Sequence, residues 1–467
     1  MKDFMKFMKS SGIFFVGTVM TKLISFLLLP LYTSYISPTD NGIYDLHLSY
    51  IMFFSSVLYF DIWSGIMRFM YDFKGEERKK PISSGIAIFL CSTVMYCATL
   101  AVVLPQLNVR YPILLGLYGA LMNGQTLVGY IARGYGKNVL YTASGIIGSF
   151  VTIVFNIILL VGMKMDYSAL IIASCIGFLT NILIIVIGVR EPHAFSLKYF
   201  DYALFKEMFL FSLPLCVNSV AYWFLTSYNR LVVDAALGPE VNGFYSVAGR
   251  FGSMITLFTT CFQMAWQELS FSKTDPNDDL GQFYTVAFNN YIKSMGAGLV
   301  LLLPMIYVIY PLLVNESYDV GKSLVPIYLL GTILSTISSF LGNAFTAIKK
   351  NNLLFYTMAV GSIANVICIH LIIGYAGIQA SNIAMAVGFF VSCLARLMLF
   401  KKYVNFKLES GSIAILLAAF VLVSFVYQNG NMIANIGTFL VAVLICAYLF
   451  RDILKEIPKF LKNIKRK

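Results

Sequence analysis

The chain has 467 residues, of which 59% are hydrophobic and only 12% are charged, and its formal net charge is +12. Soluble domains carry about 25% charged residues, so this composition excludes an ordinary soluble protein. Apolar runs of about 18 residues or more, long enough to cross a membrane, recur along the chain. We therefore expect an all-α polytopic membrane protein.

Fourteen membrane-spanning helices are predicted in chain order. Their ranges are 11–36, 43–71, 82–105, 110–133, 139–162, 167–189, 207–236, 243–270, 283–314, 323–348, 353–374, 378–400, 411–428 and 432–451. The first range follows a short basic segment and shows no cleavage site, which favours a retained helix over a signal peptide. In the ninth range, Pro304 and Pro311 predict a kink or an early exit from the membrane.

Basic residues are distributed unevenly between the two sides of this arrangement. The loops and tails on one side hold 25 lysines and arginines, whereas those on the other side hold three. Because cytoplasmic loops of membrane proteins carry the basic excess, both termini are expected in the cytoplasm. Membrane orientation and contact with anionic lipids account for the net charge, so no nucleic-acid partner is expected.

One motif repeats after 201 residues. The sequence P-x-x-N-G-x-Y begins at Pro38 and again at Pro239, each time between two apolar segments. Further pairs follow at similar spacing: Pro112 and Pro326, Ala132 and Ala347, Tyr141-Thr142 and Tyr356-Thr357, Asn156 and Asn365, and Gly177-Phe178 and Gly388-Phe389. We interpret them as two parallel copies of a six-helix unit, with each Asn-Gly in a tight turn of positive φ at the outer surface.

The repeat divides the chain into four predicted parts. An N-terminal six-helix lobe covers 1–200, and a C-terminal six-helix lobe covers 201–405. Helices 13 and 14 occupy 406–452 and have no counterpart in the repeat. The segment 453–467 is a basic amphipathic tail whose apolar residues recur at helical spacing, and we expect it on the cytoplasmic face of the membrane.

Six basic residues fall inside the predicted spans: Lys22, Arg68, Arg230, Arg250, Lys293 and Arg396. Each costs about 3 kcal/mol when it faces hydrocarbon at mid-bilayer, so most are expected to face water, a partner or a substrate. Arg396, near a cytoplasmic end, is interpreted as a side chain that extends to the membrane surface. Arg230 and Asp234, four residues apart, are expected to pair with each other, so Arg230 has either this structural role or a ligand contact.

Polar residues recur every three or four positions in spans 1, 2, 7, 8 and 9. Such stripes either hold helices together or line a shared water-filled lumen. Because they occur at corresponding places in both halves, we favour a lumen. Its candidate substrate-binding residues are Lys22, Asp61, Arg68, Arg230, Asp234, Arg250, Gln263 and Lys293. Cations outnumber acids within the spans, which suits an anionic substrate.

Motifs for catalysis, nucleotides or metals are missing from the sequence. There is no Walker A motif, no H-E-x-x-H and no C-x-x-C, and the three histidines are scattered. The predicted cytoplasmic loops are under 20 residues, too short for a catalytic domain. We therefore expect a protein that is not an enzyme and that binds no cofactor or metal, and no motif names a coupling ion such as H⁺ or Na⁺.

The opening of the chain resembles a known family. The resemblance rests on Lys22-Leu23-Ile24-Ser25-Phe26, Leu29-Pro30-Leu31-Tyr32-Thr33, Ser37-Pro38, Asn41-Gly42-Ile43-Tyr44 and Gly65-Ile66-Met67-Arg68-Phe69. These segments look like Wzx-type oligosaccharide flippases, which are polysaccharide biosynthesis proteins of the multidrug/oligosaccharidyl-lipid/polysaccharide exporter superfamily.

The resemblance implies a V-shaped pair of lobes in the bacterial cytoplasmic (inner) membrane that opens alternately to either side. The implied substrate is a lipid-linked oligosaccharide, a repeat unit on polyprenyl pyrophosphate, moved to the outer leaflet for O-antigen, capsule or exopolysaccharide assembly. Implied partners are membrane lipids, glycosyltransferases and a polysaccharide polymerase. The lumen of this family is typically cationic, which Arg68, Arg250 and Lys293 match.

Three other interpretations stay open. A multidrug exporter of the same superfamily is favoured by twelve spans and an acidic lumen, whereas a peptidoglycan-precursor flippase shares the fourteen-span layout and the cationic lumen. A membrane-embedded sugar polymerase or ligase usually needs a large outer loop, and the outer loops predicted here are ten residues or shorter.

Overall fold

The computed structural model describes residues 28–107, 109–190, 197–272, 280–348, 350 and 352–451. These ranges form helices and connecting turns, with no strand. The first half contains α2 (Leu29–Tyr35), α3 (Pro38–Leu58), α4 (Ile62–Met70), α5 (Lys79–Gln106), α6 (Pro112–Gly134), α7 (Asn138–Ile157) and α8 (Ser168–Val189). The second half contains α9 (Tyr202–Thr226), α10 (Tyr228–Leu237), α11 (Pro239–Ser272), α12 (Leu280–Leu313), α13 (Val325–Ala347), α14 (Asn352–Ala376), α15 (Gln379–Phe400), α16 (Ser410–Asn429) and α17 (Met432–Leu449).

These helices agree with the predicted spans. Every predicted range from 43–71 onward coincides with one helix or with two consecutive helices. Among the described residues, ten helical segments are long and apolar enough to cross a membrane, and the bent pair α3–α4 makes an eleventh if it is counted as one span. The range 11–36 lies mostly outside the described residues, so the count of fourteen stays a prediction. α12 continues through Pro304 and Pro311, so the early exit considered there does not occur.

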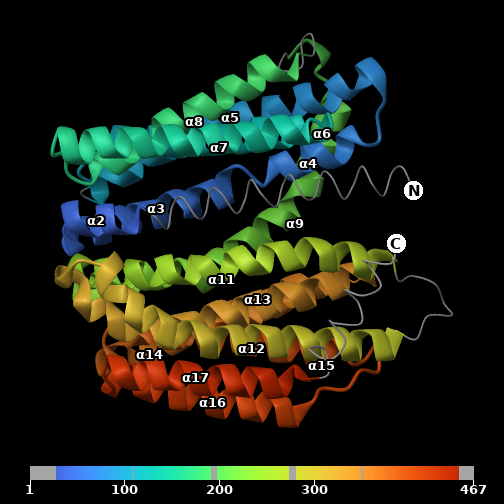
Figure 1. Cartoon of the computed structure of the whole chain (residues 1–467). Coiled ribbons are helices and arrows are strands. Elements are labelled where there is room, and N and C mark those ends of the chain that lie inside the picture. The colour runs from blue at the N-terminus through green and yellow to red at the C-terminus, as the bar shows by residue number, and fades with distance from the viewer. Residues whose placement is uncertain are drawn as a thin grey trace, which may run out of the picture.

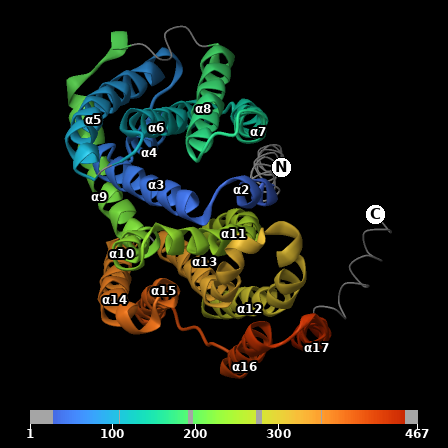
Figure 2. The ribbon, with the colours of Figure 1, turned by 90° about the vertical axis from the view of Figure 1, so that its left-hand side faces the viewer.

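The helices form two bundles and an accessory pair (Figures 1 and 2). α2–α8 pack together in one bundle, here called the N-lobe, and α9–α15 form the second, the C-lobe. α9 runs along both, because it packs against α4 and α5 as well as against α14. α16 and α17 pack against α12 on the side of the C-lobe away from the N-lobe. The predicted domain boundaries stay a prediction, and the tail 453–467 lies outside the described residues.

Large apolar side chains are exposed on the outward faces of these bundles. Ile187 of the N-lobe, Leu371 of the C-lobe and Phe425 of α16 are examples. In water such exposure is costly, but lipid tails are as apolar as these side chains. Inside each helix the backbone groups bond to one another, which the hydrocarbon requires. The all-α membrane architecture follows from these two conditions.

The two P-x-x-N-G-x-Y motifs begin helices and do not form tight turns. α3 starts at Pro38, a position that suits proline because its missing N–H has no helical partner there. Ser37 caps this helix, since its Oγ accepts a hydrogen bond from the Asp40 amide at 3.1 Å. α11 starts in the same way at Pro239. Gly42 and Gly243 are helical without positive φ, so the predicted tight turn is wrong.

The glycines of the motif serve a close helix crossing. A Cβ on Gly42 would overlap the carbonyl oxygen of Pro239, and a Cβ on Gly243 would overlap that of Pro38. The first turns of α3 and α11 therefore touch backbone to backbone. We call this end of the molecule the outer end, because the charge distribution predicts that it faces away from the cytoplasm.

Hydrogen bonds reinforce the contact between the lobes at the outer end. Asn41 Nδ2 donates to Ser246 Oγ at 2.5 Å, and the Tyr318 hydroxyl donates to the Ile36 carbonyl at 2.9 Å. From there the N-lobe and α11 diverge toward the opposite end (Figure 1). The two lobes are thus in contact at the outer end and diverge toward the opposite end.

Candidate functional site

A cavity of about 410 Å³ lies between the lobes near the outer end, and we call it the cationic cavity. Both lobes contribute to its wall. The lining residues are Tyr44, Asp45 and Leu48 of α3, Tyr118 of α6, Arg230 of α10, Ser246, Gly249, Arg250 and Ser253 of α11, and Tyr328 of α13. Part of the polar stripe predicted on span 8 therefore does face the space between the lobes.

Arg230 forms an ion pair with Asp45 of the opposite lobe, not with Asp234 as predicted. Asp45 lies three residues after Gly42, so it shares the face of α3 that crosses toward the C-lobe. The Arg230 and Asp45 side chains are only 18% and 11% exposed. The buried Oδ1 of Asp234 has no hydrogen-bond partner in the part of the chain that the structure describes. The helical i, i+4 rule failed here because the tertiary contact offers a closer and more buried partner.

No carboxylate pairs with Arg250 within the described part of the chain. Its guanidinium lies 5.6 Å from the ring centroid of Tyr32, a side chain of the N-lobe. Arg250 also lines a second cavity of about 150 Å³, whose wall includes Thr152, Asn156 and Ser174. This cationic side chain thus reaches from the C-lobe into the N-lobe.

The charges of the cationic cavity do not balance. Arg230 and Arg250 bring two guanidinium groups, and Asp45 brings the one carboxylate. A partly desolvated cation without a counterion is unfavourable, and an entering anion restores the balance. The planar guanidinium donates two parallel hydrogen bonds to a phosphate or carboxylate. Chemically, this cavity is suited to an oxyanion.

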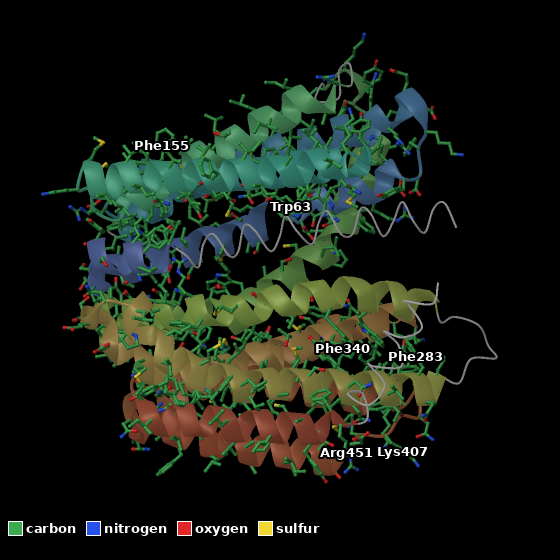
Figure 3. The ribbon with its side chains drawn as sticks, viewed as in Figure 1. Trp63, Phe155, Phe283, Phe340, Lys407 and Arg451 are labelled. Carbon is green, nitrogen blue, oxygen red and sulfur yellow. The ribbon has the colours of Figure 1, made fainter. Side chains whose placement is uncertain are left out.

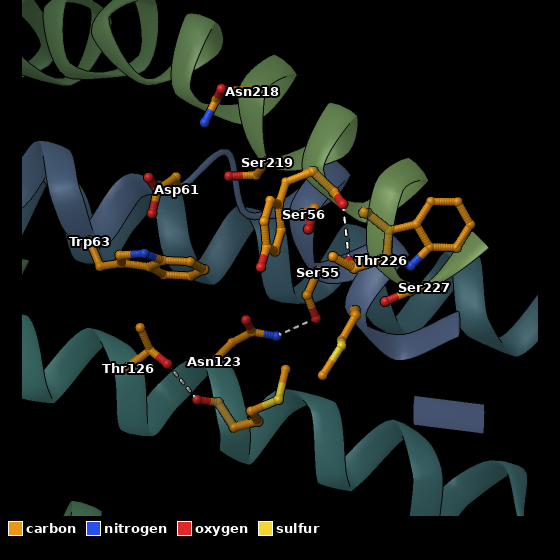
Figure 4. Close-up of a pocket in the computed structure, with 14 residues that line it drawn as sticks. Ser55, Ser56, Asp61, Trp63, Asn123, Thr126, Asn218, Ser219, Thr226 and Ser227 are labelled. Atoms are coloured by element: carbon orange, nitrogen blue, oxygen red, sulfur yellow. Dashed lines mark hydrogen bonds between the residues drawn. The ribbon is translucent and has the colours of Figure 1, made fainter. Parts of the chain in front are cut away.

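Asp61 lies in a different cavity between the lobes, which we call the Asp61 cavity. It has a volume of about 480 Å³ and is walled by α3, α4 and α6 on one side and by α9 on the other (Figure 4). Asp61 precedes the first turn of α4 and accepts a hydrogen bond from Ser64 Oγ at 3.1 Å. Trp63 and Asn123 also line the Asp61 cavity. Figure 3 labels Trp63 within the N-lobe, beside α4.

Three predicted site residues, Arg68, Asp234 and Lys293, line neither cavity. Arg68 is more than half exposed at the end of α4, where it pairs with Asp72 at 2.7 Å. Lys293 pairs with Glu409, the residue before α16, so the prediction that it joins Arg250 between the lobes is not supported by its position. The sequence offers no local signal for this pair, because 116 residues separate the two side chains. Lys22 and the Gln263 side chain lie outside the described residues.

Arg396 does not extend to the membrane surface, which corrects the prediction made for it. Its side chain is buried between α13, α14 and α15, and the residue is 4% exposed. Its Nε donates to Thr357 Oγ1 at 3.0 Å, and its Nη1 donates to the Ser338 carbonyl. These partners lie on two other helices and are distant in sequence. The position of Arg396 along its own span therefore did not predict that its side chain is buried.

Sequence reasoning missed most of the walls of these cavities. The tyrosines of the cationic cavity and the tryptophan beside Asp61 have no distinguishing sequence signal, because aromatic side chains are abundant throughout the chain. A usable signal is the repeated motif itself, since Tyr44 is its last residue and Asp45 comes next. Within the described residues, no group of three or more His, Cys, Asp or Glu is placed to hold a metal ion.

Comparisons with known proteins agree on the fold. The structure is similar to a lipid II flippase, MurJ, in an inward closed conformation, with a TM-score of 0.69 and 15% identity over 96% of this chain and 100% of that chain. It is also similar to a multidrug resistance MATE family transporter of the MOP superfamily. The TM-score is 0.64 for the inward-facing conformation (14% identity, 86% of this chain, 95% of that chain) and 0.58 for the outward-facing one (14%, 85%, 95%). No curated protein matches the chain.

The fold is therefore that of flippases and exporters of the MOP superfamily. A family model described as polysaccharide biosynthesis protein matches residues 7–266, more than half of the chain. The chain belongs to this polysaccharide biosynthesis family, as the resemblance of its opening segments predicted.

Proposed function

We propose that this protein moves polyprenyl-pyrophosphate-linked oligosaccharide repeat units from the inner to the outer leaflet of the bacterial cytoplasmic membrane, for surface polysaccharide assembly. The observation that carries the proposal is the cationic cavity between the lobes, in which Arg250 has no carboxylate partner among the described residues and lies beside the Arg230–Asp45 pair. Membership of the polysaccharide biosynthesis family points to the substrate class. Glycosyltransferases that build the repeat unit and a polymerase that consumes it are the proposed partners.

The physical problem for such a substrate is its diphosphate. Crossing about 30 Å of hydrocarbon is prohibitive for an unshielded dianion. Guanidinium groups in a hydrated cavity lower this barrier while the polyprenyl tail remains in lipid. Arg250 is half-buried and shares its cavity with tyrosine hydroxyls. A site of two guanidinium groups and hydroxyls holds an anion without trapping it.

The same cavity offers a link between binding and alternating access. A bound diphosphate competes with Asp45 for Arg230, and the Arg230–Asp45 pair joins the two lobes next to the closed outer end. Substrate binding therefore weakens a contact that must break before the outer end opens. A ligand shifts a conformational equilibrium only through such a difference in contacts between two states.

The test uses Arg250→Ala and the conservative Arg250→Lys, with Arg110→Ala as a control, because Arg110 pairs with Asp166 away from both cavities. Surface polymer and membrane-inserted protein are quantified together, and the leaflet position of lipid-linked repeat units is probed in spheroplasts. We expect Arg250→Ala to reduce polymer and leave repeat units on the cytoplasmic leaflet, with partial recovery in Arg250→Lys. Normal polymer from Arg250→Ala at normal expression rejects the proposal.

A second candidate is a peptidoglycan-precursor flippase, favoured by the similarity to the lipid II flippase over nearly the full length of both chains. The cationic cavity suits the phosphates of either substrate. Complementation decides between them. If this chain restores growth to cells depleted of their lipid II flippase, and Arg250→Ala does not, the second candidate replaces the first.

A further inference from the structure

We infer that the Asp61 cavity binds the uncharged sugar part of the substrate, while the cationic cavity binds its phosphates. This inference rests on the proposed function and adds a sugar-binding site with named residues. The two cavities share one wall: α3 supplies Asp45 to the cationic cavity and Ser55 to the Asp61 cavity. Ten residues of helix separate them by about 15 Å, so one extended ligand reaches both.

The backbone is broken on both sides of the Asp61 cavity. α3 and α4 meet at an angle of 47°, and the junction contains Phe60 and Asp61 with φ of 54° and 52°. Such left-handed conformations are strained for residues other than glycine. On the facing side α9 ends at Thr226, and α10 begins after Ser227. Irregular backbone at membrane depth is tolerated where it lines a cavity, and transporters bind their substrates at such breaks.

Several polar side chains of this cavity are available to a ligand. Ser56, Asn218, Ser219 and Ser227 form no side-chain hydrogen bond within the described part of the protein. Serine and threonine in membrane helices usually bond to a carbonyl of the preceding turn. Thr126 does so here, since its Oγ1 donates to the Met122 carbonyl at 3.0 Å. The hydroxyl groups of the three serines and the amide of Asn218 can therefore bond to a ligand in the Asp61 cavity without first breaking a bond to the described part of the protein.

A buried amide lies on the opposite wall of this cavity. Asn123 is 2% exposed, and its Nδ2 donates to Ser55 Oγ and to the Gly119 carbonyl, both at 2.8 Å. These two bonds fix the side chain, and its Oδ1 remains as an acceptor. Figure 4 shows Asn123 and Trp63 on the same side of the cavity, opposite Ser219 of α9.

The composition of the lining indicates which kind of ligand fits. Among the described residues, no lysine, arginine or histidine lines the cavity, and Asp61 is the one carboxylate. Neutral donors and acceptors suit a ligand rich in hydroxyl groups, and a carboxylate accepts from two hydroxyls at once. Trp63 and Tyr222 add aromatic rings, whose electron-rich faces suit the C–H groups of a sugar ring.

An organic cation is the strongest competing ligand, because a carboxylate beside aromatic rings also suits a cation. Two observations favour the sugar. Neutral hydrogen-bonding groups outnumber the acid in the described lining of the Asp61 cavity. In addition, Arg230 and Arg250 line the adjoining cavity, and their positive charges repel a cationic ligand. A sugar attached to a diphosphate satisfies both cavities.

The experiment uses the intrinsic fluorescence of the purified full chain in lipid nanodiscs. The chain has three tryptophans, and Trp63 and Trp223 line the Asp61 cavity. Trp266 instead stacks on Phe283 and packs against Phe340 in the C-lobe (Figure 3). In a Trp266→Phe background, fluorescence therefore reports on the Asp61 cavity, and binding of the sugarless lipid to the cationic cavity is measured by its competition with the sugar-bearing lipid. The two ligands are undecaprenyl pyrophosphate without sugar and the lipid-linked repeat units extracted from the bacterium that makes this chain.

The variants are Asn218→Ala and Ser219→Ala, with Asn429→Ala and Ser317→Ala as exposed controls of the same residue types. One neutral hydrogen bond corresponds to about a fivefold change in affinity. We expect each cavity variant to weaken binding of the sugar-bearing lipid by about fivefold and to leave binding of the sugarless lipid unchanged. Unchanged binding of the sugarless lipid also shows that the variants are folded.

Other outcomes overturn the inference in distinguishable ways. If the cavity variants bind both lipids like the parent while Arg250→Ala weakens both, the sugar site is wrong and the proposed function stands. If the parent chain binds neither lipid, the proposed function falls together with the inference. If tetraphenylphosphonium binds and Asp61→Asn abolishes its binding, the cavity is a cation site.

Discussion

Gly42 of α3 and Gly243 of α11 each lie against the backbone of the proline that begins the other helix. The two motifs of the repeat, 201 residues apart, thus meet in space and contact each other reciprocally. The contact closes the outer end directly beside the Arg230–Asp45 pair. Glycine is needed at both positions because the two helices approach each other closely there. Neither glycine has a positive φ.

Adding a methyl group at this crossing is expected to open the outer end. In Gly42→Ala, the new Cβ meets the Pro239 carbonyl oxygen, and such overpacking costs about 1–3 kcal/mol. We expect a lower unfolding temperature and stronger labelling of a cysteine at Ser246 by a membrane-impermeant maleimide. Gly411→Ala is the control, because nothing lies within 4 Å of the Cβ it adds. Equal labelling in both variants contradicts the role of the crossing.

Breaking the ion pair between the lobes is expected to destabilise the protein. Asp45→Asn leaves Arg230 without its counter-charge in a largely buried position, and loss of one partner of a buried pair costs on the order of 3 kcal/mol. The double variant Asp45→Asn/Arg230→Gln removes the unpaired charge and is expected to recover part of the loss. A double-mutant cycle on the free energy of unfolding measures the coupling. Additive effects of the two changes reject a direct pair.

Arg396 is expected to stabilise the C-lobe. In Arg396→Ala, the Ser338 carbonyl and Thr357 hydroxyl lose their donor, and a space shaped around the guanidinium next to Gly342 is left empty. We expect a loss of about 2 kcal/mol in the free energy of unfolding. Arg110→Ala, in an exposed ion pair, is expected to cost about 1 kcal/mol at most. If both variants unfold alike, Arg396 is not a packing element of this lobe.

The Lys293–Glu409 pair is expected to make the attachment of α16 dependent on pH. The hydrogen bond from Lys293 lowers the pKa of Glu409 from its ordinary value of 4.5. A carboxyl with a depressed pKa in the folded state stabilises the protein above pH 4.5, and this contribution is lost as pH falls through the lower pKa of the folded state.

Thermal unfolding of the parent chain and of Glu409→Gln tests this dependence. The pair is partly exposed, so the difference between the two proteins at pH 7 is expected to be about 1 kcal/mol at most, and to shrink below pH 4.5. A difference that stays constant from pH 7 to pH 3.5 shows that the carboxylate charge does not stabilise α16.

The sequence by itself determined the membrane class, the ranges of the helices and the internal repeat. Each of these rests on properties that are local or periodic along the chain: apolar runs long enough to cross a bilayer, and a motif that recurs after 201 residues. It also singled out Arg230, Arg250 and Asp61, because a charged or polar residue inside an apolar run is costly unless it faces a cavity.

Only the tertiary structure decided which of these residues meet. Arg230 pairs with Asp45 of the other lobe and not with Asp234 of its own helix. Lys293 pairs with Glu409, and Arg396 donates a hydrogen bond to the Ser338 carbonyl inside the C-lobe. A buried charge takes the partner that relieves the most desolvation, and that partner is fixed by how helices cross and not by spacing along one helix. The division of the lumen into a cationic cavity and the Asp61 cavity follows from the same crossings, since α3 carries both walls while α9, α10 and α11 face them.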